Sequence, residues 1–408
     1  MADIPQPFIC GFVPPYILQA IASSDSYPEE SRLACLHTLK HAKSYADERD
    51  DSCAYDHEVL AQAQQAAQQE AQQAAQQTLA AAGGEPAAGG ESAARMQIRI
   101  YDCKETANRP GTLARSEGQA RVKDRQVNNC YDGFRITHDF FSEVFKRNSL
   151  DHKGLPLIAS VHYKPATAPN GYNNAFWDGM MNQMVFGDGD HIFFDYFTDS
   201  LDVIAHELSH GFVQYSSPLI YYGESGALNE SCADIFGCMV EQWHMRQTAA
   251  EADWNLGQTM FPVAFTGSAL RTLKAGRAFV NDPVFRTDPQ PKHMDKKYKG
   301  KGDRGGVHIN SGIPNHAFYK AATRLEGSSW DKVGRVWYKT MTSGEILPDC
   351  NFHRFAEVTV KIAKTEFNQD QSVWEAIHAA WGEVGIRVPT ESTGAGESAK
   401  GEELKVNV

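Results

Sequence analysis

Hydrophobic and polar residues are distributed differently in successive parts of the chain. In residues 1–57, apolar residues recur at helix-like intervals after a pair of prolines, which predicts two short helices separated by turn residues. The recurring residues are Ile17, Ile21, Leu33, Leu36, Leu39 and Ala42. Residues 58–95 are rich in Gln, Ala and Gly and have almost no side chain large enough to anchor a core. We therefore interpret residues 58–95 as a linker.

From residue 96 onward the pattern is that of a folded protein. QIRIYDC at 97–103 alternates as a strand does, and LIASVHY at 157–163 and HIFFDYF at 191–197 are short apolar runs, so we expect β-structure up to about residue 198. Helical patterns follow at 201–215, 227–247, 312–325, 331–343, 351–366 and 371–381. Strands followed by helices predict an α+β fold with a β-rich lobe at 96–215 and a helical lobe at 216–387. The polar residues 388–408 are expected to form a flexible tail.

The charge of the chain limits the kinds of molecule that it is expected to bind. The net charge is −12 and 42% of the residues are hydrophobic. An acidic chain does not suit nucleic acid or an anionic membrane surface, so we expect neither as a partner. No run of 18 apolar residues occurs and no signal peptide is recognisable. We expect the chain to be cytoplasmic as synthesised, with secretion by a leaderless route left open.

The chain has eight cysteines, and none of them forms a CxxC pair. The even number permits disulfides, but the chain is far from a small cysteine-dense scaffold. We interpret the cysteines as ordinary thiols.

Residues 206–210 read HELSH, which is a candidate metal site. Two histidines four apart on a helix lie about 40° apart around its axis, so His206 and His210 can bind one ion. Glu207 lies about 100° further round. It would point beside the metal, where a base for an attacking water is needed.

A second segment completes this candidate site. Residues 226–234 read GALNESCAD, and Glu230 comes 20 residues after His210, so a second helix could supply a third ligand. Two nitrogens and one carboxylate leave a fourth position open, as in catalytic zinc sites. Asp234, one turn later, and Asn229 could each bind the far nitrogen of a ligand histidine. We expect one catalytic Zn²⁺.

With these motifs in place, residues 96–387 resemble the thermolysin family of metallopeptidases. The resemblance also rests on NNAFWDGMMNQMVFGDGD at 173–190, ALRTL at 269–273, GDRGGVHINSGIPNHAFY at 302–319 and WEAIHAAWGEVGI at 374–386. It implies a two-lobed thermolysin-like fold with the zinc site between the lobes. The implied activity is that of a zinc-dependent neutral endopeptidase acting on peptides or proteins.

The resemblance also assigns roles to residues. It implies that Tyr221 and His308 stabilise the oxyanion of the tetrahedral intermediate and that Asp303 orients His308. Substrate backbone would be held by Asn174, the Ala175 backbone and Arg271. A specificity pocket for a bulky apolar residue after the cleaved bond would be formed by Phe194, Phe197, Val203 and Leu270.

In calcium binding the sequence departs from the family pattern. Asp202, Glu241 and Asp253 match carboxylates of the family's calcium cluster, but Asn255 and Gln258 stand where the family usually has acids. Losing two carboxylates weakens a two-ion site. We therefore expect at most one Ca²⁺.

The N-terminal segment resembles the short propeptide of protealysin-like enzymes. Its mark is a Pro-Pro-x-Tyr-type sequence, and here VPPYILQAIA carries Pro14, Pro15 and Tyr16 with altered spacing. The resemblance implies a small helical propeptide that inhibits its own enzyme and is removed by self-cleavage. Two alternatives stay open here: a catalytically silent homologue that binds peptides in its cleft, and an interaction domain at 1–57. The presence of Glu207 together with the oxyanion residues favours the active enzyme over the silent homologue.

Overall fold

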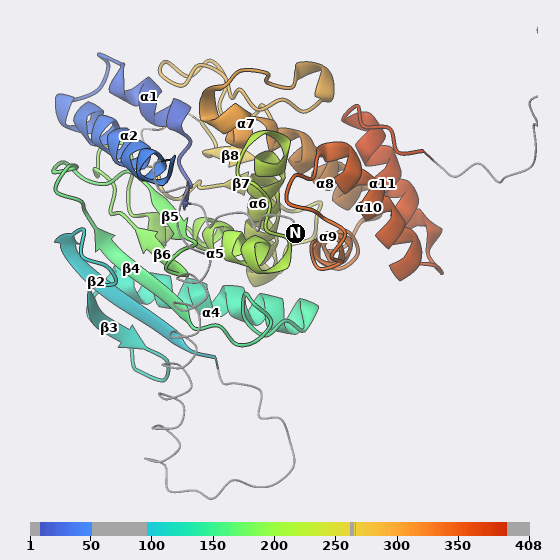
Figure 1. Ribbon diagram of the computed structural model, residues 1–408, viewed down its shortest axis with the longest axis horizontal. Helices are drawn as coiled ribbons and strands as arrows, with labels where there is room; N and C mark the ends of the chain where they lie inside the picture. The colour runs from blue at the N-terminus through green and yellow to red at the C-terminus, as the bar shows by residue number, and fades with distance from the viewer. Residues whose placement is uncertain (1–8, 51–95, 262–264, 266, 390–408) are drawn as a thin grey trace, which may run out of the picture.

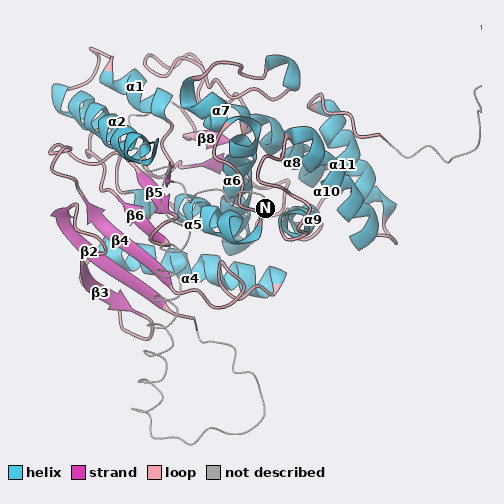
Figure 2. Cartoon of the chain, viewed as in Figure 1, coloured by secondary structure: helices cyan, strands magenta, loops and turns pink. Residues whose placement is uncertain are grey.

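The computed structural model describes residues 9–50, 96–261, 265 and 267–389. The strands of the large sheet gather on one side of the molecule, and most helices of the C-terminal half lie on the other (Figure 2). The predicted linker at 58–95 lies outside the described residues, as does almost all of the predicted tail at 388–408. Within the described part, no helix is both long enough and apolar enough to cross a membrane.

A six-stranded mixed sheet forms the first part of the folded body. Its strands are β1 (Ile9–Gly11), β2 (Ile98–Thr106), β3 (Thr112–Ser116), β4 (Leu157–Tyr163), β5 (Ala175–Asp178) and β6 (Gln183–Phe186). The order in the sheet is β1-β5-β6-β4-β2-β3, with β2, β4 and β6 parallel and the other neighbours antiparallel. The N-terminal segment thus supplies one edge strand, β1, which covers the edge of β5 (Figure 1).

One long helix interrupts the segment that we expected to be β-structure. α4 (Arg125–Phe145) packs on β2, β4 and the helix that follows the sheet. The β-structure expected up to about residue 198 is thus interrupted by a helix that the sequence interpretation did not predict. The side chain of Asp124 caps the helix by accepting hydrogen bonds from the backbone N–H groups of Gln126 and Val127. Buried side chains recur along α4 every three or four residues, which is the amphipathic signal that the sequence interpretation overlooked; they include Val127, Cys130, Phe134, Phe141 and Phe145.

The predicted strand at 191–197 is also absent from the structure. Oδ1 of Asp190 accepts hydrogen bonds from the backbone N–H groups of Ile192, Phe193 and Phe194, which folds this run into a turn. A single 3-10 turn, η1 (Phe197–Asp199), follows. Short apolar runs do not distinguish a strand from a buried loop, and here the polar group before the run decided the outcome.

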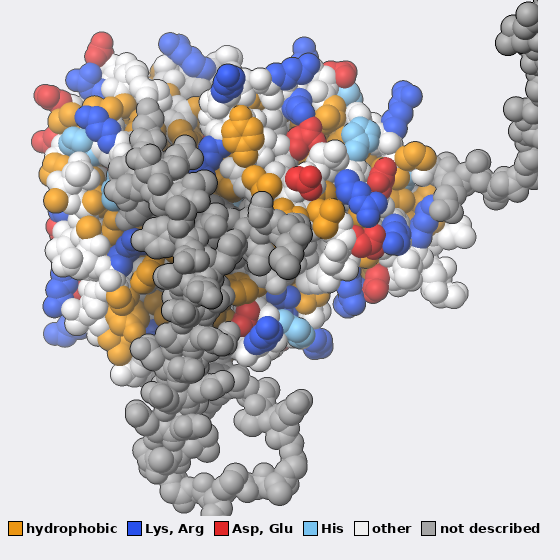
Figure 3. Space-filling model, viewed as in Figure 1, with side chains coloured by type: hydrophobic (Ala, Val, Ile, Leu, Met, Phe, Trp, Pro, Cys, Tyr) orange, Lys and Arg blue, Asp and Glu red, His pale blue; other side chains and the backbone are white. Residues whose placement is uncertain are grey.

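The second part of the body is helical, as expected. It contains α5 (Leu201–Ser216), α6 (Gly223–Met245), α7 (Gly302–Asn310), α8 (Gly312–Leu325), α9 (Val333–Met341), α10 (Phe352–Glu366) and α11 (Gln371–Glu383). The short strands β7 (Asn255–Leu256) and β8 (Arg271–Thr272) and the 3-10 turn η2 (Met294–Lys296) lie between α6 and α7. The rings of Trp337 and Trp381 stack 5.9 Å apart in the core of this part. On the described surface seen in Figure 3, basic and acidic side chains are interspersed.

The two predicted N-terminal helices are present as α1 (Pro15–Ala22) and α2 (Glu29–Asp50). They pack on each other at the end of the sheet to which β1 is added (Figure 1). The buried face of α2 carries small and polar residues instead of its leucines: Ser31, Ala34, Cys35 and Thr38. Oγ1 of Thr38 accepts a hydrogen bond from the Asn173 backbone, so α2 docks on the body through polar contacts.

Candidate active site

Two adjacent helices bring the three predicted metal ligands together. His206 and His210 come from α5 and Glu230 from α6, and all three are fully buried. The Nε2 atoms of the two histidines lie 3.1 Å apart. Glu230 Oε2 lies 3.8 Å from His206 Nε2, and Glu230 Oε1 lies 3.6 Å from His210 Nε2. The helices can approach because Gly237 has no side chain: a Cβ there would lie 2.8 Å from the carbonyl oxygen of Asp202.

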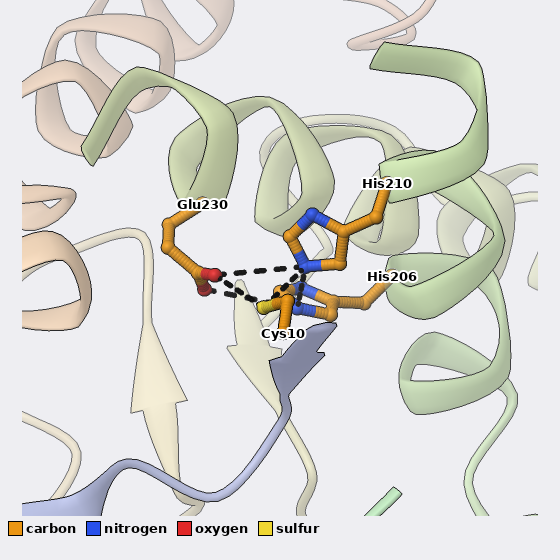
Figure 4. Close-up of side chains that lie close together, drawn as sticks. All are labelled: Cys10, His206, His210 and Glu230. Carbon is orange, nitrogen blue, oxygen red and sulfur yellow. Dashed lines mark hydrogen bonds and ion pairs between the residues drawn. The ribbon is translucent and has the colours of Figure 1, made fainter. Parts of the chain in front are cut away.

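The far nitrogens of both histidines have the predicted partners. Nδ1 of His206 lies 2.9 Å from Oδ1 of Asp234, and Nδ1 of His210 lies 2.8 Å from Oδ1 of Asn229. These contacts turn both Nε2 atoms toward Glu230 (Figure 4). Burial lowers the pKa of His210 to about 4. The neutral imidazole is the form that binds a metal ion.

The donor set fits a zinc ion. Glu230 Oε2 and Glu207 Oε1 are buried and have no hydrogen-bond partner, which is rare for buried polar atoms. Burial raises the pKa of Glu230, but the neighbouring histidines, His308 first among them, outweigh that effect and lower it to about 2. An ionised carboxylate beside two imidazoles, with one oxygen left unsatisfied, matches the ligand set of a catalytic zinc site.

Glu207 lies beside this cluster and points to the sheet. Its Oε2 accepts a hydrogen bond from the backbone N–H of Trp177 at 2.8 Å, while Oε1 stays without a partner. Burial, and next to it the charge of Glu230, raises the pKa of Glu207 well above its usual value. This is the environment of a carboxylate whose proton affinity is increased for proton transfer.

The residues expected to stabilise an oxyanion surround the opposite side. Tyr221 OH lies 3.3 Å from His308 Nε2 and also contacts Glu230. Nδ1 of His308 is 2.6 Å from Oδ1 of Asp303. Burial alone would lower the pKa of His308, but the carboxylates of Glu230 and Asp303 outweigh it and raise that pKa. The structure therefore favours a protonated His308, which can donate a hydrogen bond through Nε2.

The groups expected to hold substrate backbone instead hold the N-terminal segment. Oδ1 of Asn174 accepts a hydrogen bond from Val13 N–H at 2.8 Å, and the Ala175 carbonyl accepts one from Phe12 N–H at 3.0 Å. The guanidinium of Arg271 donates to the Phe12 carbonyl at 2.7 Å. His308 Nε2 lies 3.2 Å from the Gly11 carbonyl oxygen. Residues 11–13 thus occupy, through their backbone atoms, the groups that the sequence assigned to substrate.

An aromatic side chain of the same segment enters the apolar interior. Phe12 is fully buried, meets the His206 ring edge-on at 5.0 Å, and lies under the Arg271 guanidinium at 4.3 Å. It belongs to one contiguous buried cluster with the four residues predicted to form the specificity pocket. These four, all 0% or 1% exposed, are Phe194, Phe197, Val203 and Leu270.

The Pro-Pro pair links this extended segment to α1. Pro14 is buried with extended backbone angles, φ −61° and ψ 145°, and serves as the N-cap of the helix. Pro15 occupies the first helical position, where a missing N–H costs nothing. Tyr16 is half-buried against the core. The prolines thus end the cleft-bound strand and start the helix.

One residue of the cluster was missed by the sequence interpretation. Cys10 is 1% exposed, and its Sγ lies 2.7 Å from Glu230 Oε1, 2.8 Å from Tyr221 OH and 3.0 Å from His210 Nε2. The sequence carried one usable signal, a cysteine four residues before Pro14 in a segment expected to enter a metal-containing cleft. The other described cysteines are buried as free thiols, in agreement with the interpretation of ordinary thiols.

The three carboxylates considered for calcium do not form a metal-binding group like that of the predicted zinc ligands. Among the described residues, the group that could hold a metal ion is the one formed by Cys10 with the predicted zinc ligands. Asp202 uses Oδ1 to accept a hydrogen bond from Val203 N–H and Oδ2 to accept one from Gly257 N–H. Asp253 accepts one from Asn255 N–H. Calcium binding therefore stays a prediction.

The pKa of Glu241 makes the prediction of calcium binding testable. Burial, and next to it the charges of Asp202 and Asp253, raises its pKa to about 9. The folded state then keeps a proton that the unfolded state loses near pH 4.3, so stability falls as pH rises from about 4.3 to about 9. We expect Glu241→Gln, compared with the parent in a chelator, to raise the thermal midpoint at pH 8 and to change it little at pH 4.

Thermal scans at the two pH values, with and without calcium, check this expectation. A calcium ion bound at Glu241 would stabilise the parent at pH 8 and leave Glu241→Gln unaffected. Equal midpoint differences at pH 4 and pH 8 would show that Glu241 is not held protonated.

Comparisons with known proteins agree with this geometry. The family described as thermolysin metallopeptidase, catalytic domain, matches residues 62–214, and its alpha-helical domain matches residues 217–386. Protease PrtS of a Photorhabdus species is 40% identical over 391 residues, covering 93% of both chains. An extracellular metalloprotease of Pectobacterium carotovorum is 38% identical, covering 94% of this chain and 98% of its own. The solved precursor of protealysin, a metalloproteinase from Serratia proteamaculans, matches with a TM-score of 0.74 at 39% identity, covering 92% of this chain and 99% of its own.

Proposed function

Because this chain belongs to the thermolysin metallopeptidase family and is a metalloprotease, a neutral endopeptidase, we propose that it cleaves peptide bonds before bulky apolar residues and is made as a self-inhibited precursor. The inhibitory segment is residues 1–57. Its removal by self-cleavage within 58–95 releases the enzyme.

The proposed roles follow the contacts described above. His206, His210 and Glu230 hold the zinc ion, with Asp234 and Asn229 fixing the two imidazoles. A zinc ion held there would supply Lewis-acid chemistry, polarising the substrate carbonyl and increasing the acidity of the attacking water.

The remaining steps belong to the protein's own side chains. Glu207 takes the proton of the attacking water on its unpartnered Oε1 and delivers it to the leaving amine. Tyr221 OH and His308 Nε2 donate hydrogen bonds to the developing oxyanion, and the carboxylate of Asp303 keeps His308 protonated and oriented. These donors are fixed before substrate arrives, so they reorganise little during the reaction.

The observation that carries the proposal is the placement of residues 11–13. Their backbone groups bind Asn174, the Ala175 carbonyl and Arg271, while Phe12 is buried beside His206. A peptide substrate can make the same backbone contacts whatever its sequence, so selectivity has to come from the side chain at the position of Phe12. A buried aromatic there supports a preference for bulky apolar residues after the cleaved bond, and it also supports inhibition by the segment itself.

A peptide-library digest tests the specificity. The processed enzyme should cut mainly before Phe, Leu and Ile and discriminate against Ala by roughly 10-fold or more, since losing several buried methylenes costs on the order of 2 kcal/mol. Mass spectrometry of the products identifies the residue that follows each cut. A matched digest with a zinc chelator should give no cleavage. Preferred cutting before charged or small residues would contradict the proposed pocket.

A further inference from the structure

We propose that Cys10 is a fourth metal ligand in the precursor, so that its thiolate closes the zinc site and fastens the inhibitory segment in the cleft. This inference rests on the proposed function, because it concerns the same metal site and the same segment. The ligand atoms of Cys10, His206, His210 and Glu230 all lie within 4.8 Å of one another. Figure 4 shows the thiol entering from β1, opposite the helices, and pointing between the imidazoles and the carboxylate.

The chemistry of this donor set favours a closed metal site, in which all four ligands come from the protein. Zinc sites with four protein ligands are structural and closed, whereas catalytic sites keep one position for water. Two imidazoles and a carboxylate alone make the open form, and a thiolate added to them makes the closed one. A zinc-bound thiol is deprotonated, so its proton passes to solvent as the sulfur takes the position that water needs. An independent sign that this cluster binds a cation is Glu230 Oε2, which is buried and has no hydrogen-bond partner.

The fold delivers the thiol through the register of one strand pair. In the antiparallel pairing of β1 with β5, Cys10 lies opposite Trp177 and Gly11 opposite Phe176. A slip by one residue would turn the thiol to the other face of the strand, and Phe12 in the core opposes such a slip. Gly11 permits the close approach, since a Cβ there would lie 2.5 Å from Asn174 Nδ2.

The binding of zinc by Cys10, which we call the latch, explains how a segment that is bound in the manner of a substrate can inhibit the enzyme. Gly11 presents its carbonyl to His308 and Phe12 is buried beside His206, so the Gly11–Phe12 bond precedes a bulky apolar residue in the cleft. Cleavage of that bond needs a water at the position that the sulfur of Cys10 takes. The thiolate therefore protects the segment while it blocks the enzyme.

X-ray absorption at the zinc edge tests the latch directly. Full-length Glu207→Ala protein, which keeps all the proposed ligands and cannot process itself, should show one sulfur at about 2.3 Å from zinc beside the nitrogen and oxygen neighbours at about 2.0–2.2 Å. Adding Cys10→Ser should remove the sulfur shell. The matched control is Cys35→Ser, because Cys35 is a buried thiol of the same segment that contacts Asn173 instead of the cluster. That control should keep the sulfur shell.

Zinc release gives a second readout. A competing chelator should remove zinc from the Cys10→Ser protein at least roughly tenfold faster than from the Cys35→Ser protein, since even an indirect partner of a metal ligand is worth 10–100-fold in affinity. If Cys10→Ser does not fold, the spectrum of the Glu207→Ala protein alone decides. The absence of a sulfur shell there, with zinc bound, overturns the latch.

The outcomes separate the latch from the proposed function. Zinc held by nitrogen and oxygen alone in a precursor that becomes an active peptidase when processed would refute the role of Cys10 and leave the proposed function standing. A processed protein that binds no zinc, or that cleaves no peptide, would refute the proposed function itself.

Discussion

Replacing Glu207 with Ala should lower peptidase activity by roughly 10²–10⁴-fold or more while zinc stays bound, because proton transfer by a positioned side chain contributes that much. Glu207 lies beside the metal cluster and contacts the Trp177 backbone instead of joining the ligands. The same substitution should leave the chain at full length, since the proposed self-cleavage needs the same base. Intact mass over time and zinc content of the purified protein check both parts.

Glu207→Gln is the matched control for packing, because its amide oxygen can still accept the Trp177 hydrogen bond. It should be as inactive as Glu207→Ala and should retain zinc equally well. Activity within about tenfold of the parent in either variant, with metal retained, would refute the assignment of Glu207 as the base. Loss of zinc in both variants would instead show that Glu207 helps to hold the metal.

The metal site could be predicted because most of its geometry is local. His206, Glu207 and His210 share one helix, where spacing alone fixes which side chains meet. Glu230 comes from the next helix in the chain and, together with Asp234 and Asn229, lies where the spacing of GALNESCAD placed it. Helical periodicity also located α5, α6 and α8 to α11 to within a few residues, but it did not predict α7.

The features that were missed depend on contacts distant in sequence or on a single polar group. Cys10 meets His210 across 200 residues, and no local pattern encodes that contact. The turn at 191–197 depends on the side chain of Asp190, which satisfies three backbone N–H groups that a strand would have paired with a neighbour. α4 did have a local signal in its cap at Asp124 and its amphipathic spacing, but the expectation of strands up to residue 198 concealed it.

Phe12→Ala should weaken the docking of the N-terminal segment more than other single changes of an apolar side chain in that segment. Phe12 is fully buried at the cleft between His206 and Arg271. Truncating a buried Phe to Ala costs about 3–5 kcal/mol. Because this side chain is exposed to water only when the segment leaves the cleft, that cost falls on the docked state. The equilibrium between docked and released segment should shift by roughly 10²–10³-fold.

Hydrogen exchange in the Glu207→Ala background measures this shift without self-cleavage. Amides of residues 10–22 should exchange roughly 10²–10³-fold faster in the Phe12→Ala variant, as far as docking limits their exchange. Phe352→Ala is the matched control, because Phe352 is an equally buried phenylalanine of α10, far from the segment in sequence and in another part of the fold. It should lower global stability and leave exchange of residues 10–22 relative to the rest of the chain unchanged. Unchanged exchange of residues 10–22 in the Phe12→Ala variant would mean that the Phe12 ring does not hold the segment in the cleft. The backbone contacts to Asn174 and Arg271, together with Cys10, would then have to hold it alone.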